Sequence, residues 1–149
     1  MKKFLIITML LLTGCGYQPV YLDRDYKNFE FSKITSEGDL NINKKIINSL
    51  QLKEGNLEKS LNELNINSIF ENLETSKNLK GNSKSYKISI SVNLKITNNG
   101  NLIQEEKFYK EFFYNEKENQ FQLVQQQQNI RENLINKIIE EITIYLNTK

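Results

Sequence analysis

Histidine and tryptophan are absent from the 149-residue sequence, and cysteine and proline occur once each. Without histidine there is no imidazole base, no histidine metal ligand and no Ser/His or Cys/His nucleophile pair. No glycine begins a phosphate-binding loop, because no Lys-Ser or Lys-Thr pair follows one at the required spacing. We therefore expect no catalytic residues, no metal site and no cofactor, and we predict a binding or assembly protein rather than an enzyme.

The first residues have the order of an export signal. A positive pair precedes the mostly apolar segment 4–12, and small residues follow it. This order is typical of a secretory signal, and the apolar run is much shorter than the about 20 residues that span a bilayer. The tetrapeptide Leu-Thr-Gly-Cys at 12–15 also resembles a bacterial lipobox, in which the cysteine receives diacylglycerol and an N-acyl chain. We expect residues 1–14 to be a lipoprotein signal peptide and Cys15 to be lipidated.

The mature chain would have no net charge. Loss of Lys2 and Lys3 with the signal lowers the basic count from 20 to 18, against 18 acidic residues. No strongly basic surface is implied, so nucleic acid is not an expected partner. With Cys15 carrying lipid no disulfide can form, and stability must come from packing.

Residues 16–28 show no sustained period and include the only proline. We interpret 15–28 as a lipidated tether, which would reach about 40 Å when extended. The remaining residues, 29–149, are enough for a single domain with one core.

The first elements of this domain are a short strand and a helix. Alternation of Phe29 and Phe31 with polar residues weakly indicates a strand. Asp39 is a good N-cap, and Gly55 is a plausible helix stop. The helix between them has one apolar face, formed by Leu40, Ile46, Ile47 and Leu50.

Segment 57–83 is ambiguous, because leucines spaced as in a helix overlap with alternation typical of a strand. Two helices need a sheet of several strands to pack on, which favours a strand between Leu61 and Thr75. Residues 80–83 (Lys-Gly-Asn-Ser) have the composition of a turn.

Segment 86–97 has the clearest pattern in the chain, a strand with one apolar face. The apolar positions are Tyr86, Ile88, Ile90, Val92, Leu94 and Ile96. The following Asn98-Asn99-Gly100 predicts a hairpin turn in which Gly100 has a positive φ.

Two hairpin registers are possible. A three-residue loop, which we favour, would place Phe108 opposite Ile90 and Phe112 opposite Tyr86 on the core side, and Glu111 opposite Lys87. A two-residue loop of Asn99 and Gly100 would place three charged residues among the aliphatics, with Tyr109 opposite Ile90. In the favoured register the solvent face carries Ile103, Tyr109 and Phe113, an apolar cluster that can serve as a partner contact or be partly covered by a loop.

The C-terminal segment from Phe121 onward predicts a long amphipathic helix. Its apolar face is formed by Ile130, Leu134, Ile135, Ile138, Ile139, Ile142 and Leu146. The glutamines at 125–128 lie in its first turns, where they either are solvated or contact a polar wall. The resulting fold class is α+β: a two-layer sandwich with a roughly four-stranded, mainly antiparallel sheet and two helices on one face.

Residues 12–21, Leu-Thr-Gly-Cys-Gly-Tyr-Gln-Pro-Val-Tyr, resemble the mature N-terminus of alphaproteobacterial lipopolysaccharide-assembly lipoproteins, the LptE family. The resemblance implies that 29–149 is an LptE-like domain that plugs and helps assemble an outer-membrane β-barrel translocon (LptD-like) delivering lipopolysaccharide to the cell surface. It also implies an outer-membrane location facing the periplasm and barrel lumen. Cys15 would be the lipid site, and Gly16 would permit outer-membrane sorting.

Tyr109, Phe113 and Gln126 are the candidate partner-facing residues. Alternative functions are a lipoprotein subunit of another envelope assembly machine and a stand-alone periplasmic lipid-binding lipoprotein. A lipid carrier would need an apolar cavity large enough for acyl chains, whereas a barrel plug would be solid.

Overall fold

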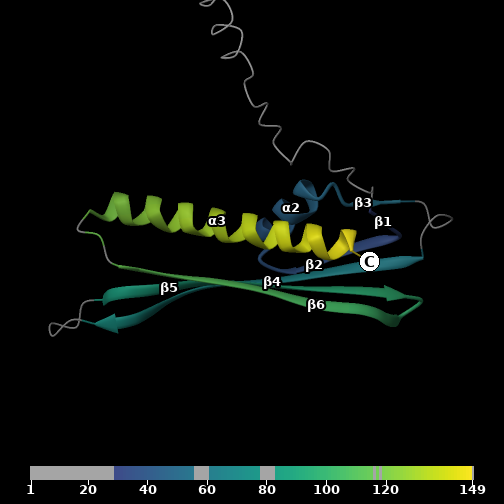
Figure 1. Ribbon diagram of the computed structural model, residues 1–149, viewed down its shortest axis with the longest axis horizontal. Coiled ribbons are helices and arrows are strands. Elements are labelled where there is room, and N and C mark those ends of the chain that lie inside the picture. Colours follow the sequence, from purple (N-terminus) through teal and green to yellow (C-terminus); the bar gives the residue numbers. More distant parts are fainter. Residues whose placement is uncertain (1–28, 56–60, 78–82, 116, 118, 149) are drawn as a thin grey trace, which may run out of the picture.

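The computed structural model describes residues 29–55, 61–77, 83–115, 117 and 119–148. The expected signal peptide, the tether and most of the expected turn at 80–83 lie outside these residues. Within them the chain forms two layers, with both helices on the same face of a long twisted sheet (Figure 1). The elements in chain order are β1 (Glu30–Phe31), β2 (Lys33–Gly38), α2 (Leu40–Ser49), β3 (Lys53–Glu54), β4 (Asn62–Lys77), β5 (Ser83–Asn98), β6 (Asn101–Asn115) and α3 (Gln120–Asn147).

The main sheet has the strand order β2-β4-β5-β6. β2 is parallel to β4, and the other neighbours are antiparallel. β1 and β3 pair separately as a small parallel sheet. The predicted α+β sandwich with a four-stranded, mainly antiparallel sheet is confirmed.

β4 resolves the ambiguous segment. It is a strand of 16 residues in which Leu64, Ile66 and Ser68 are buried at every second position. β2 pairs with its first half and β5 with its whole length. Backbone hydrogen bonds to two neighbouring strands therefore decide a conformation that the local pattern left open.

The predicted faces of β5 are confirmed. Ile88, Ile90, Val92 and Leu94 are at most 2% exposed and lie under the helices. These side chains meet the apolar face of α3, where Ile138 and Ile142 are fully buried. The predicted C-terminal helix is thus confirmed together with its inward face. Among the described residues, none of the helices has the length and apolar character needed to cross a membrane.

The hairpin register differs from both alternatives. Asn98 pairs with Asn101, and Asn99 and Gly100 have φ of 48° and 78°. The positive φ of Gly100 is confirmed. The turn consists of two residues, as in the alternative that we did not favour. Two positive φ values are typical of a type I′ turn, whose twist matches that of the strands.

A bulge next to this turn then shifts the register once more. Thr97 pairs with Leu102 but Ile96 pairs with Gln104, so Ile103 is an extra residue. One inserted residue reverses the alternation, which returns Phe108 to the core side. Phe108 lies opposite Val92 rather than Ile90. The other predicted pairs are also wrong by two residues: Phe112 faces Ile88, and Glu111 faces Ser89.

The helix after Asp39 is confirmed at its start, but its predicted end and apolar face need correction. Asp39 Oδ1 accepts hydrogen bonds from the backbone of Asn41 (3.0 Å) and Ile42 (3.2 Å). The helix ends at Ser49, and Gln51 has a φ of 50°, so Gly55 is not the stop. Leu40 is 55% exposed. Successive residues are about 100° apart around the helix axis, and on that wheel Leu40 lies about 60° outside the arc of buried positions. That arc contains Ile42, Asn43, Ile46 and Leu50.

Candidate partner-binding surface

The sheet face opposite the helices carries Tyr109 and Phe113 of the expected apolar cluster, whereas its third member, Ile103, is the extra residue of the bulge. Tyr109 is 46% and Phe113 58% exposed on this face. β4 adds Ile69 and Leu73, since Ile69, Ser91 and Tyr109 are aligned across three strands, as are Leu73, Lys87 and Phe113. We call Ile69, Leu73, Tyr109 and Phe113 the open-face patch. Sequence reasoning missed its β4 half, because the pairing of β4 with β5 was not apparent from local pattern.

Polar groups run through the middle of the open-face patch. The Tyr109 hydroxyl donates to Glu111 Oε2 at 2.6 Å, and Lys87 Nζ lies 3.7 Å from the same carboxylate oxygen. The hydrogen bond to Glu111 raises the pKa of the Tyr109 phenol, since the neutral hydroxyl is the donor. Ser89 Oγ donates to Glu71 Oε2 at 3.3 Å. The patch therefore has two apolar columns separated by polar side chains.

A second polar group lies on the same face nearer the β5–β6 turn. Asn93 Nδ2 donates to Glu105 Oε1 at 2.8 Å, and Lys95 Nζ lies 3.3 Å from that oxygen. The hydrogen bond from Asn93, followed by the Lys95 contacts, lowers the pKa of the Glu105 carboxyl. Glu105 therefore stays ionised and paired. This arrangement suits non-covalent contact with a mixed polar and apolar surface.

Gln126 does not lie with Tyr109 and Phe113. It belongs to the opposite layer, on α3, and is half-buried. Its Oε1 is buried and has no hydrogen-bond partner among the described residues. The neighbouring Gln127 donates from Nε2 to the Tyr114 hydroxyl at 2.9 Å. The structure thus separates Gln126 from the other two candidate residues. Cys15 and Gly16 lie outside the described residues, so their roles stay predictions.

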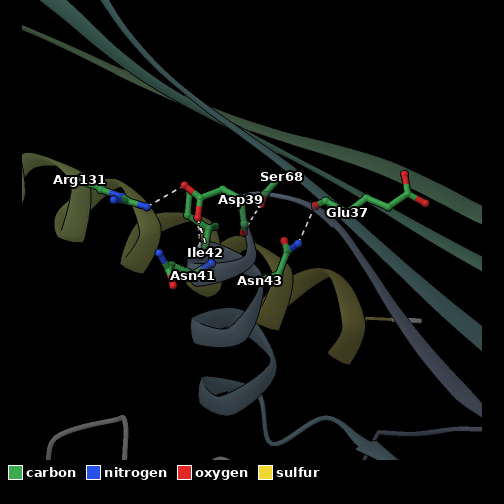
Figure 2. A network of polar contacts seen from close by, with 7 residues as sticks. All are labelled: Glu37, Asp39, Asn41, Ile42, Asn43, Ser68 and Arg131. Carbon is green, nitrogen blue, oxygen red and sulfur yellow. Dashed lines mark hydrogen bonds and ion pairs between the residues drawn. The ribbon is translucent and has the colours of Figure 1, made fainter.

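A polar network at the junction of β2 and α2 holds the helices against the sheet (Figure 2). Asp39 Oδ2 accepts from Arg131 Nη2 of α3 at 2.8 Å, while Oδ1 caps α2. The Asp39 backbone N–H donates to Ser68 O at 2.9 Å, and Ser68 Oγ donates to Asp39 O at 3.0 Å. Asn43 Nδ2 donates to Glu37 O at 2.7 Å. Asp39 therefore links three elements: its backbone N–H and C=O contact β4, and its carboxylate contacts α2 and α3.

Substitution of Asp39 separates its two roles. Asp39→Ala removes both the cap and the ion pair, and we expect it to lower the free energy of unfolding by about 2 kcal/mol. Asp39→Asn keeps the cap and loses only the charge pairing with Arg131, so we expect a loss of about 1 kcal/mol. Urea unfolding followed by circular dichroism measures both. Equal losses in the two variants would show that the ion pair, and not the cap, accounts for the contribution of Asp39.

The described residues include no group of three or more histidine, cysteine, aspartate or glutamate side chains placed to hold a metal ion. The carboxylates described above on the open face and in the network are paired with hydroxyl, amide or cationic groups. Their geometry supports binding and structural roles.

No protein-family model matches the sequence. No curated protein matches it either.

Solved structures do resemble the fold. Rare lipoprotein B from Shewanella oneidensis has a TM-score of 0.55 at 12% identity, covering 78% of this chain and 96% of that chain. A minor lipoprotein from Acinetobacter baumannii has a TM-score of 0.57 at 14% identity, covering 77% and 90%. Lipoprotein B from Nitrosomonas europaea has a TM-score of 0.52 at 12% identity, covering 78% and 82%. The chain therefore shares the α+β fold of these bacterial lipoproteins.

Proposed function

We propose that this protein is an outer-membrane lipoprotein of the LptE type, which plugs and helps assemble the β-barrel translocon for lipopolysaccharide. The observation that carries the proposal is the coincidence of two independent features. The folded domain resembles solved lipoproteins over nearly their whole length, and the chain has the lipobox-like Leu-Thr-Gly-Cys before that domain.

The surface of the domain supports a plug. The lumen of a large outer-membrane barrel is polar and wet, and a plug must match it while offering a few apolar anchors. The open face combines such anchors, Tyr109 and Phe113, with paired charges such as Lys87–Glu111 and Lys95–Glu105. Paired charges limit the cost of transferring this face from water to a polar wall.

The interior argues against a stand-alone lipid carrier. The space between the sheet and helices is filled by side chains with little or no exposure, including Ile46, Ile66, Ile90 and Ile138. A cavity of about 370 Å³ lies between α3 and β6. Its lining is mixed, with Asn133, Asn136, Lys137 and Glu140 beside Phe112, Ile130 and Leu134, whereas acyl chains need an extended apolar cavity.

Photo-crosslinking in living cells tests the proposal. A crosslinker at Tyr109 on the open face should trap the outer-membrane barrel, and one at Ile144, an exposed residue of α3, shows whether the helix layer contacts the barrel as well. Depletion of the protein should leave the barrel misassembled and lipopolysaccharide stalled in the periplasm. Crosslinks only to soluble periplasmic proteins, with surface lipopolysaccharide unchanged after depletion, would contradict the proposal and favour another envelope machine.

A further inference from the structure

β4 has a free edge over part of its length. β2 pairs with β4 only as far as Gly38 opposite Ser68, while β4 continues to Lys77. At Gly38 the backbone has a φ of +77° and leads into α2. Within the part of the chain that the structure describes, no strand lies beside β4 beyond Ser68 on that side. Register shifts begin after Glu74, so the regular free edge is 69–73.

The hydrogen bonds made by the earlier residues of β4 show in which direction the backbone groups of this edge point. Asn62 O and Ser68 O accept from residues on the β2 side, Ser32 and Asp39. Because backbone groups alternate in direction along a strand, the N–H and C=O groups of Phe70 and Asn72 also point away from β5. Those of Ile69, Glu71 and Leu73 point toward β5.

On the helix side, a cavity adjoins the free edge. Its volume is about 240 Å³, and β4 contributes Phe70 and Asn72 to its wall. The opposite wall comes from α3, with Val124, Gln127, Gln128 and Arg131. The Arg131 guanidinium lies 4.8 Å from the centre of the Phe70 ring. A side chain of a strand added at this edge would enter the cavity, since every second residue of that strand faces the helices.

On the open face, the same edge presents an acidic group between two aliphatic ones. Ile69 and Leu73 are 54% and 49% exposed, and Glu71 between them is exposed. A lysine or arginine opposite Glu71 could place its charge at the carboxylate and pack its methylene groups against Ile69 and Leu73. Charge complementarity therefore favours a basic residue at the position that faces away from the helices.

We propose that the edge 69–73 of β4 binds an extended segment of a partner protein as an added strand. The segment carries an apolar residue that enters the cavity over Phe70 and, next to it, a basic residue opposite Glu71. Main-chain hydrogen bonds to Phe70 and Asn72 supply affinity, and the two alternating side chains supply specificity. The inference does not depend on the barrel, because any partner segment with this pattern fits the edge.

A proline substitution tests the added strand. Asn72→Pro removes the outward N–H, which β5 does not use, and proline is compatible with an edge strand. Asn72→Ala is the matched control, because both variants lose the hydrogen bond from the Tyr114 hydroxyl to Asn72 Oδ1. With a photo-crosslinker at Ile69 in the full chain in its own cells, we expect Asn72→Pro to lower the adduct yield by about tenfold relative to Asn72→Ala. Glu71→Lys should also lower the yield, and Glu71→Gln should do so less.

Hydrogen exchange gives a second readout that does not require the proline variant to fold. In the complex captured by the crosslinker at position 69, with no other substitution, the amides of Phe70 and Asn72 should exchange more slowly than in the free protein. The amides of Glu71 and Leu73, already directed to β5, should change little. Any one of four results would overturn the proposal. The adduct yield could be insensitive to Asn72→Pro, or hydrogen exchange at Phe70 and Asn72 could be unchanged. No adduct could form, or the adduct could be with residues 16–28 of the same chain.

Mass spectrometry of the adduct separates this inference from the proposed function. A proline-sensitive adduct at Ile69 with a protein other than the barrel, together with no barrel adduct at Tyr109, would support edge binding and contradict the barrel role. A barrel adduct that ignores Asn72→Pro would support the barrel role and overturn edge binding.

Discussion

Replacement of Gly38 by alanine is expected to lower the free energy of unfolding by about 3 kcal/mol, while Gly100→Ala should cost only about 1 kcal/mol. Both glycines have nearly the same φ, +77° and +78°. A Cβ at Gly38 would lie 1.9 Å from the carbonyl oxygen of Ser68, whereas nothing lies within 4 Å of a Cβ at Gly100. The difference between the two losses of unfolding free energy therefore measures the cost of placing a Cβ where β2 approaches β4 closely.

The clash at Gly38 cannot be relieved by a side-chain rotation, because the atom that it meets belongs to the backbone. The Ser68 carbonyl also accepts from the Asp39 N–H at 2.9 Å, so any shift disturbs the junction that begins α2. Urea unfolding of the two variants, with m-values equal to wild type, gives the two losses. Similar losses in both variants would show that the positive φ alone, and not the contact with Ser68, accounts for the requirement for glycine.

Replacement of Cys15 by alanine is expected to move the protein from the membrane fraction to the soluble fraction. A single acyl chain gives marginal binding and several chains anchor firmly, so the anchor would be lost as a whole. We expect the folded domain to begin after the lipid site, at Phe29, where the described residues start. We therefore expect the thermal unfolding midpoint of Cys15→Ala to equal that of the unlipidated wild-type domain.

A second variant separates anchoring from sorting. Gly16→Asp should still carry lipid but remain with the inner membrane. Asp at this position retains a lipoprotein there, and the family that residues 12–21 resemble avoids it. Mass spectrometry of the mature N-terminus and membrane fractionation measure the two properties. Membrane association of Cys15→Ala at the wild-type level would refute the lipid anchor, whereas outer-membrane location of Gly16→Asp would refute only the sorting role.

Three features of the fold were predictable from local sequence alone. Strict alternation specified the buried face of β5, the spacing of Ile130, Leu134, Ile138 and Ile142 specified the inner face of α3, and Asp39 specified the start of α2. Each of these signals is complete within one element. A strand face has period two and a helix face period 3.6, and a cap binds the first turn of its own helix.

Features that depend on two elements at once were decided only in the tertiary structure. β4 is a strand because β2 and β5 pair with it, and the positions of Phe108 and Phe112 depend on a bulge at Ile103. The open-face patch joins Ile69 and Leu73 to Tyr109 and Phe113 across a strand, while Gln126 lies on the other layer. The reason is physical: a shift of the pairing register gives a side chain other neighbours, or moves it to the other face of the sheet, without any change in the local hydrophobic pattern. The sequence by itself thus determined the buried faces of β5 and α3, and only the packed sheet decided which residues of neighbouring elements meet.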